Sequence, residues 1–228
     1  MLKHRSDEVE IMDDLSISGE VVNQTLRELN TINRRLGGNQ ISVSAFKKLA
    51  KGKEKVSLAD LGCGGGDIMV QMAKWTRKEE IDASFVGIDA NKNIVEYATA
   101  HTNAYPEITY QAINIFSDEF KSQSFDIIHC CLFVHHFTSQ QLATLFRQFR
   151  KQAKVGVIIN DLHRHPLAYW SITLLTSLFS KSLMVRNDAA ISVARGFKKG
   201  ELKEILEQAG ITEYSLSWKW AFRWKLVF

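Results

Sequence analysis

The chain has 228 residues, 45% of them hydrophobic and only two of them proline, which is enough for one large domain with a buried core. The net charge is +4 and no dense run of Lys and Arg occurs, so the sequence does not indicate a nucleic-acid partner. Three cysteines are too few for a disulfide framework, and the first residues form no apolar signal segment. We therefore expect a cytoplasmic protein.

The first fifty residues have a helical pattern. Apolar residues recur at helical spacing at Val22, Leu26, Leu29, Ile32 and Leu36. Ser18 can cap the start of this helix, and the glycine pair at 37–38 ends it. A shorter helix is expected at about 43–50. Both precede the first strand, so we interpret residues 1–53 as an N-terminal helical extension that either caps a site or packs on the edge of the sheet.

From residue 56 onward, short apolar strands alternate with helices. Strands are predicted at 56–61, 84–89, 108–113, 125–130 and 155–160. Helices are predicted between them at 68–78, 92–101 and 139–151. This alternation predicts an α/β fold with a doubly wound, mostly parallel sheet, forming one domain over residues 54–228.

The alternation of strands and helices stops after the fifth predicted strand. Residues 167–180 form an apolar segment too short to span a bilayer, which needs about 20 residues. It is either a buried core helix, the wall of a hydrophobic substrate pocket, or a surface that contacts a membrane peripherally. A further helix is expected at 197–209. Residues 218–228 alternate strictly and predict one strand, with three tryptophans on its buried face and Lys219, Arg223 and Lys225 on its wet face.

The sequence is organised around a glycine-rich turn between the first strand and the following helix. Gly62, Gly64 and Gly66 leave space for close backbone approach to a ligand, and the helix start points free N–H groups at the same place. The dinucleotide fingerprint G-x-G-x-x-G fails because the sixth position is Asp67 or Met69, and the Lys-Ser/Thr pair of a P-loop is missing. The turn, with Asp60 before it, resembles motif I of the class I S-adenosylmethionine-dependent methyltransferases.

Ligands of doubly wound sheets bind at the carboxyl ends of the strands. The second strand ends at Asp89, whose carboxylate can accept hydrogen bonds from a ribose diol or can cap the next helix. The third ends at Asn114 and Ile115, and the fourth at Cys130 and Cys131. In this order the strand ends resemble those of class I methyltransferases from about residue 58 to 160.

The resemblance implies a Rossmann-like seven-stranded sheet that binds S-adenosylmethionine and releases S-adenosylhomocysteine. It places Gly62, Gly64 and Gly66 at the methionine part, Asp89 at the ribose, and the pair at 114–115 at the adenine. The full set of expected cofactor-binding residues is Asp60, Gly62, Cys63, Gly64, Gly66, Asp89, Ala90, Asn114, Ile115, Cys130 and Cys131.

If the molecule that accepts the methyl group is a phenol, it attacks better as its oxyanion. A general base that removes the hydroxyl proton would therefore speed the reaction. The first candidate is His163, followed by His136, then His135 and Asp161, all at the same end of the sheet. The run His129-Cys130-Cys131 lacks the usual ligand spacing of zinc sites, and adjacent strand residues point in opposite directions, so no metal is expected.

The segments 10–13, 29–33, 160–164 and 186–193 resemble a bacterial subgroup often encoded near type III polyketide synthases. This implies a lipophilic small-molecule substrate of a phenolic or quinol-like kind. Methylation on oxygen and methylation on carbon are both left open by the sequence, and a monomer or homodimer is expected. The alternatives are an RNA or protein methyltransferase, and a non-catalytic protein that only binds adenosylmethionine. The sequence shows no clear basic binding face or appended recognition domain, so a small-molecule O-methyltransferase is the leading hypothesis.

Overall fold

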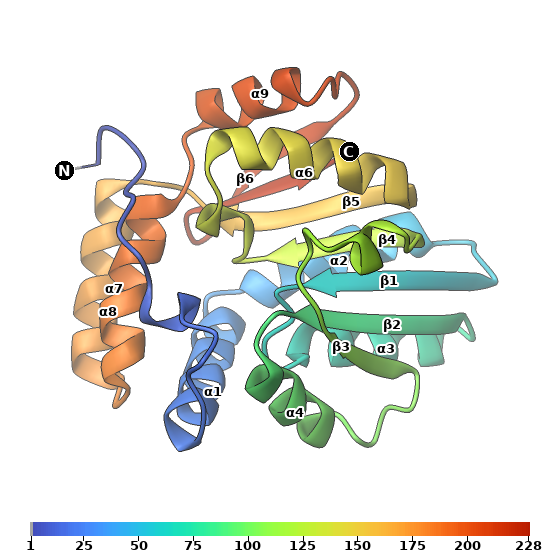
Figure 1. Cartoon of the computed structure of the whole chain (residues 1–228), viewed down its shortest axis with the longest axis horizontal. Coiled ribbons are helices and arrows are strands. Elements are labelled where there is room, and N and C mark those ends of the chain that lie inside the picture. The colour runs from blue at the N-terminus through green and yellow to red at the C-terminus, as the bar shows by residue number, and fades with distance from the viewer. Residues whose placement is uncertain (1) are drawn as a thin grey trace.

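A seven-stranded sheet forms the centre of the computed structural model, which describes residues 2–228 (Figure 1). Its strand order is β3–β2–β1–β4–β5–β7–β6, in which β1 to β5 are parallel and β7 is antiparallel to both neighbours. The strands are β1 (Lys55–Leu61), β2 (Asp82–Asp89), β3 (Ile108–Ala112), β4 (Phe125–Cys131), β5 (Ala153–Leu162), β6 (Ser215–Lys219) and β7 (Arg223–Val227). This confirms the expected α/β methyltransferase-type sheet.

Helices cover both faces of the sheet. Strand β1 is buried on both sides, which explains why its sequence is mostly apolar. Val56 and Leu58 pack with α2 and α3, whereas Ala59 and Leu61 belong to the core that includes α6 and α9. α4 contacts β2 and β3 near the sheet edge. The bounds are α2 (Gly38–Ala50), α3 (Asp67–Lys78), α4 (Lys92–His101), α5 (Asp118–Lys121), α6 (Ser139–Gln152) and α9 (Lys199–Gln208).

A second group of helices lies beyond the carboxyl ends of the parallel strands. Figure 1 shows the arrowheads of β1, β2 and β4 pointing toward this group. α7 and α8 pack as a helical hairpin, and α8 contacts α1 and the short turn η1. The bounds are η1 (Ile11–Asp13), α1 (Glu20–Arg35), α7 (Pro166–Phe179) and α8 (Leu183–Arg195). The space between this group and the strand ends is where the site forms.

The single C-terminal strand predicted for 218–228 is wrong. The chain reverses at residues 220–222 to form the β6–β7 hairpin, although the alternation of apolar residues in the sequence continues across this turn. Trp218 and Trp220 are therefore 44% and 69% exposed, and only Trp224 is buried. Arg223 was expected on the solvent-exposed face, but it is only 3% exposed. Its buried guanidinium donates a hydrogen bond to Asn33 Oδ1 at 2.6 Å.

The apolar segment forms α7, but it is not a buried core helix. Leu167, Trp170, Leu174 and Leu178 are each more than 60% exposed. The helix buries little else than Ala168 and Thr176, on the side that faces α8. None of the helices in residues 2–228 is both long and apolar enough to cross a membrane.

Candidate active site

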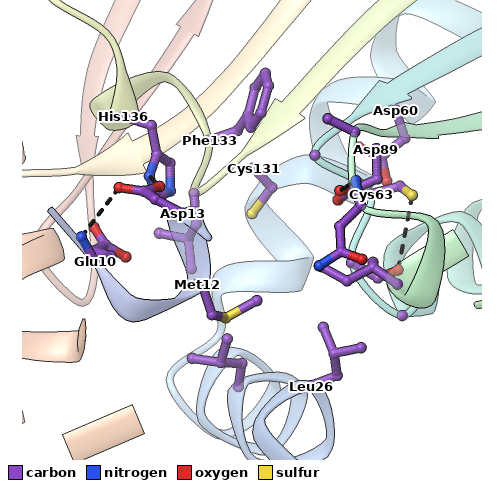
Figure 2. Close-up of a pocket in the computed structure, with 18 of the residues that line it drawn as sticks. Glu10, Met12, Asp13, Leu26, Asp60, Cys63, Asp89, Cys131, Phe133 and His136 are labelled. Atoms are coloured by element: carbon purple, nitrogen blue, oxygen red, sulfur yellow. Dashed lines mark hydrogen bonds and ion pairs between the residues drawn. The ribbon is translucent and has the colours of Figure 1, made fainter. Parts of the chain in front are cut away.

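A cavity of about 430 Å³ opens at the carboxyl ends of β1 to β4. The strand ends form one wall, and residues of η1, α1 and α8 form the others. Figure 2 shows two polar groups on opposite sides of this cavity, with Met12 and Leu26 between them. We call the side of Asp60, Cys63 and Asp89 the glycine-turn end, and the side of Glu10, Asp13, His135 and His136 the histidine end.

The glycines of the turn are required by the surrounding packing. Gly62 has φ of 67° and lines the cavity, and a β-carbon there would overlap the Phe133 ring. Gly66 has φ of 78° and a β-carbon there would overlap the Tyr110 hydroxyl. Gly64 lines the cavity with φ of 51°, whereas Gly66 lies behind the lining, where it starts α3. The turn therefore presents backbone, rather than side chains, to the cavity.

Three carboxylates line the glycine-turn end, those of Asp60, Asp67 and Asp89, and Asp67 accepts a hydrogen bond from Asn30 Nδ2 at 2.6 Å. Asp60 is 3% exposed, and its Oδ1 lies 2.6 Å from His129 Nδ1, whose ring bonds through Nε2 to the Ser42 hydroxyl at 2.8 Å. Asp89 accepts the Asn91 N–H at 2.9 Å. Burial raises the pKa of Asp89 to about 6. Because Asp60 and Asp67 are already paired, Asp89 is the carboxylate better placed to accept hydrogen bonds from a ligand.

The end of β3 closes the same part of the cavity. Asn114 and Ile115, which follow β3, line it together with Ala90, which follows β2. The Asn114 side-chain oxygen accepts the Phe116 N–H at 2.9 Å, which folds this side chain onto its own loop. The structure thus brings together most of the residues that the sequence assigned to the cofactor.

The two neighbouring cysteines separate. Cys131 lines the cavity, whereas Cys130 is 1% exposed and belongs to the core under α6. Adjacent side chains of a strand point to opposite faces, so only one of the two can face a ligand.

At the histidine end, His135 is held from both sides and is 2% exposed. Its Nδ1 lies 2.7 Å from Asp161 Oδ1, and its Nε2 lies 3.4 Å from Glu10 Oε1. Burial alone would lower the pKa of His135, but the neighbouring Asp161 and Glu10 outweigh it and raise the pKa to about 9. This position therefore favours a positive charge.

His136 is the more accessible histidine. Its Nδ1 lies 2.6 Å from Asp13 Oδ1, and the other Asp13 oxygen lies 2.7 Å from Arg195 Nη1. Burial would raise the pKa of Asp13, but His136 and Arg195 hold it well below its usual range. His136 is about one-fifth exposed and lines the cavity, as Figure 2 shows.

The short turn η1 is anchored to α8 by one carboxylate. Asp188 accepts the backbone N–H groups of Ile11 and Met12 at 2.8 and 3.0 Å. This anchor fixes Glu10 and Asp13 beside the two histidines. Sequence reasoning did not identify these three acidic residues, and its only signal was the resemblance of segments 10–13 and 186–193 to the bacterial subgroup.

Two of the residues expected to act as a base lie outside the cavity lining. His163 packs against Trp224 and accepts the Trp218 indole N–H at 3.3 Å, because it follows β5 beneath the β6–β7 hairpin. Asp161 is buried beneath the histidine end, where it holds His135. The candidates that reach the cavity are therefore His135 and His136.

Comparison with known proteins agrees with this arrangement. Residues 58–156 match the family model of a methyltransferase domain. No curated protein sequence matches the chain. The solved structures that match share the fold at low sequence identity.

One is the plantazolicin methyltransferase in complex with S-adenosylhomocysteine, which is 19% identical over 87% of this chain and 79% of that chain, with a TM-score of 0.62. Another is the magnesium protoporphyrin IX methyltransferase of Synechocystis with bound S-adenosylmethionine, 15% identical over 95% of this chain and 88% of that chain, with a TM-score of 0.55. A third is the CurJ carbon methyltransferase, 14% identical over 83% of this chain and 53% of that chain, with a TM-score of 0.60.

Residues 58–156 match a methyltransferase domain, and the chain shares its fold with solved methyltransferases that have S-adenosylmethionine or S-adenosylhomocysteine bound.

Proposed function

We propose that the protein methylates a lipophilic small molecule, and that the acceptor is the hydroxyl of a phenol or quinol. The observation that carries this proposal is the cavity itself. Its volume of about 430 Å³ is in the range of small-molecule sites, and it joins the glycine-turn end to the histidine end across an apolar middle. Met12, Leu26 and Phe133 line that middle, which suits a flat apolar ring.

The residues of the glycine-turn end would hold the methyl donor. The backbone of Gly62 and Gly64, which carries no side chain at the cavity, would approach its methionine part, and the Asp89 carboxylate would accept two hydrogen bonds from its ribose. Asn114 and Ile115 would contact its adenine. S-adenosylmethionine supplies an activated methyl group, so the protein mainly has to align the acceptor and exclude water.

At the histidine end, His136 is the group that would receive the hydroxyl proton of the acceptor. His135 is less suited because Asp161 and Glu10 occupy both sides of its ring. Asp13 beside His136 would stabilise the imidazolium that forms. With the methyl donor at the glycine-turn end, the polar groups left for the acceptor hydroxyl would be those of the histidine end.

The test is methyl transfer to a panel of phenols, quinols, carboxylic acids and amines, read as a mass increase of one methylene group. We expect phenols or quinols to be methylated, and His136→Gln to lower kcat by roughly 100-fold, as loss of a general base does, without changing the affinity for S-adenosylhomocysteine. His163→Gln serves as the matched control and should retain kcat. Methylation of only amines, or of RNA or protein substrates, would contradict the proposal.

The alternative functions make different demands on this site. A methyltransferase for RNA or a folded protein has to admit a large acceptor, whereas this cavity is covered by η1, α1 and α8. A protein that only binds the cofactor has no need of paired histidines and carboxylates opposite it. These features favour a small-molecule enzyme.

A further inference from the structure

Three buried polar atoms of the histidine end make no hydrogen bond of regular geometry within the described residues: Glu10 Oε1, His135 Nε2 and His136 Nδ1. The first two face each other at 3.4 Å, and His136 Nδ1 has an ion-pair contact with Asp13 Oδ1 at 2.6 Å. Glu10 and His135 are 5% and 2% exposed, so water has little access to them. Buried polar atoms without regular hydrogen bonds are rare in native proteins and call for an explanation such as an ion or a bound water. Here, one ligand atom from each of these three residues lies within 4.8 Å of the others.

We propose that Glu10, His135 and His136 bind a divalent transition-metal ion, with Zn²⁺ as the best match to their donor atoms. Two histidine nitrogens and one carboxylate oxygen are a common ligand set for zinc sites that keep an open position. The remaining position would face the cavity that all three residues line.

The spacing of the ligand atoms supports an ion rather than a direct hydrogen bond. His135 Nε2 and Glu10 Oε1 are 3.4 Å apart, which is long for a charge-assisted hydrogen bond. Two ligands held about 2.0–2.1 Å from a tetrahedral ion lie about 3.4 Å from each other. The atoms are therefore placed as two corners of such a site.

The residues behind the ligands support the same conclusion. Asp161 Oδ1 lies 2.7 Å from Nδ1 of His135, which directs Nε2 of that ring toward Glu10 and the cavity. A carboxylate behind a metal-bound histidine is a frequent arrangement, because it fixes the ring and increases its basicity. Asp161 in turn accepts three consecutive backbone N–H groups from residues 133–135, so its own position is fixed.

The net formal charge of the histidine end would be balanced by a divalent cation. Four carboxylates hold this end together, from Glu10, Asp13, Asp161 and Asp188. Two guanidinium groups bond to the same turns, from Arg5 and Arg195. With neutral histidines, two negative charges remain, which a divalent ion would balance. When the ion binds, His136 Nδ1 would exchange its contact with Asp13 for the ion, and Asp13 would keep its contact with Arg195.

The role of the ion in catalysis, unlike its binding, rests on the proposed function. The oxygen of a phenolic acceptor would occupy the open position, where coordination lowers the pKa of its hydroxyl. The hydroxyl proton would then pass to solvent instead of to His136, and the phenolate held by the ion would attack the methyl group, with S-adenosylhomocysteine as the leaving group. The binding of the ion is a separate claim and can be measured without any acceptor.

The test is titration of chelator-treated protein with Zn²⁺ by calorimetry and with Co²⁺ by visible absorption, in the absence of cofactor and acceptor. We expect one equivalent to bind with a Kd on the order of 1 μM or tighter, with the intense absorption of four-coordinate Co²⁺. Glu10→Gln should weaken binding by about 100-fold or more, and His163→Gln should bind as the unaltered protein does. Thermal melting and S-adenosylhomocysteine binding show whether each variant is folded.

Absence of a one-equivalent site in the folded protein would overturn the proposal, and so would equal binding by Glu10→Gln. In either case the carboxylate contacts of the two histidine rings would account for their positions without an ion. Full turnover of a phenol by metal-free protein would overturn the ion's role and leave the proposed function standing. Tight metal binding without methylation of any phenol or quinol would support the site and contradict the proposed acceptor.

Discussion

The two ends of the cavity differ in how far apart their residues lie along the chain. The glycine-turn end comes from residues 60–67 and 88–91, which are successive strand ends of one parallel sheet. The histidine end combines residues 10–13, 135–136 and 188–195, which meet only because η1 and α8 pack over the sheet. The first end follows from the fold that many methyltransferases share, whereas the second is particular to the helices added to it. We therefore expect changes at one end to leave the other intact.

Asp89→Ala should produce the largest effect. The carboxylate would lose two charge-assisted hydrogen bonds to the ribose, each contributing about 1.5–3 kcal/mol, so the affinity for S-adenosylhomocysteine should fall by at least about 100-fold. Isothermal titration calorimetry measures this change. Asp118→Ala, at a fully exposed aspartate of α5, is the control and should keep the affinity. An unchanged affinity in Asp89→Ala would show that the ribose binds elsewhere.

Asp188→Asn should affect the opposite end. The amide can accept only one of the two backbone N–H groups of η1 that the carboxylate now holds. We expect kcat/KM for the acceptor to fall by about tenfold, as loss of one hydrogen bond to a charged group predicts, while the affinity for S-adenosylhomocysteine stays the same. Parallel steady-state kinetics and calorimetry separate the two quantities. A matching loss of cofactor affinity would show that the two ends are coupled.

The pH dependence of cofactor binding should report on Asp89 alone. Burial raises the pKa of this carboxyl to about 6, and only the ionised form accepts hydrogen bonds from both ribose hydroxyls. The affinity should therefore be constant above about pH 7 and fall by up to about tenfold for each pH unit below 6. Calorimetry from pH 5 to 8 tests this, and Asp89→Asn should remove the slope. A slope that survives in Asp89→Asn would assign the titration to another group.

Trp170→Ala should have the smallest effect. Trp170 is 63% exposed on α7, and this helix contributes no residue to the cavity lining. We expect less than a twofold change in kcat/KM for the acceptor, measured in detergent-free buffer. A tenfold loss would mean that the apolar face of α7 takes part in acceptor binding after all.

The residues of the glycine-turn end could be grouped from the sequence because their signals are local. The positive φ of Gly62 and Gly66 requires glycine, and a carboxylate at the end of β2 is visible from strand and turn patterns alone. Strand parity also separates Cys130 from Cys131 once β4 is placed. The same reasoning gave the order of strands and helices from β1 to β5.

The histidine end could not be predicted in this way. Glu10 and Asp188 lie 178 positions apart, and neither sits in a motif with a mechanism of its own. His163 was the preferred base because it follows β5, yet the β6–β7 hairpin covers it. That hairpin was read as one strand, because the alternation of tryptophans continues across the turn at residues 220–222. Packing between segments that are distant in the sequence determines where these residues lie. The periodicity of a single segment carries no information about such packing.

Asp161 has a consequence for the motions of the loop after β4. One buried carboxylate accepts three successive main-chain N–H groups, from Phe133, Val134 and His135. These amides can exchange their hydrogens with solvent only when the carboxylate is exposed with them, so they should open together as one unit. A loop would thus have the slow hydrogen exchange of the strand beneath it, and the two histidines that it carries would be held in place on the timescale of catalysis.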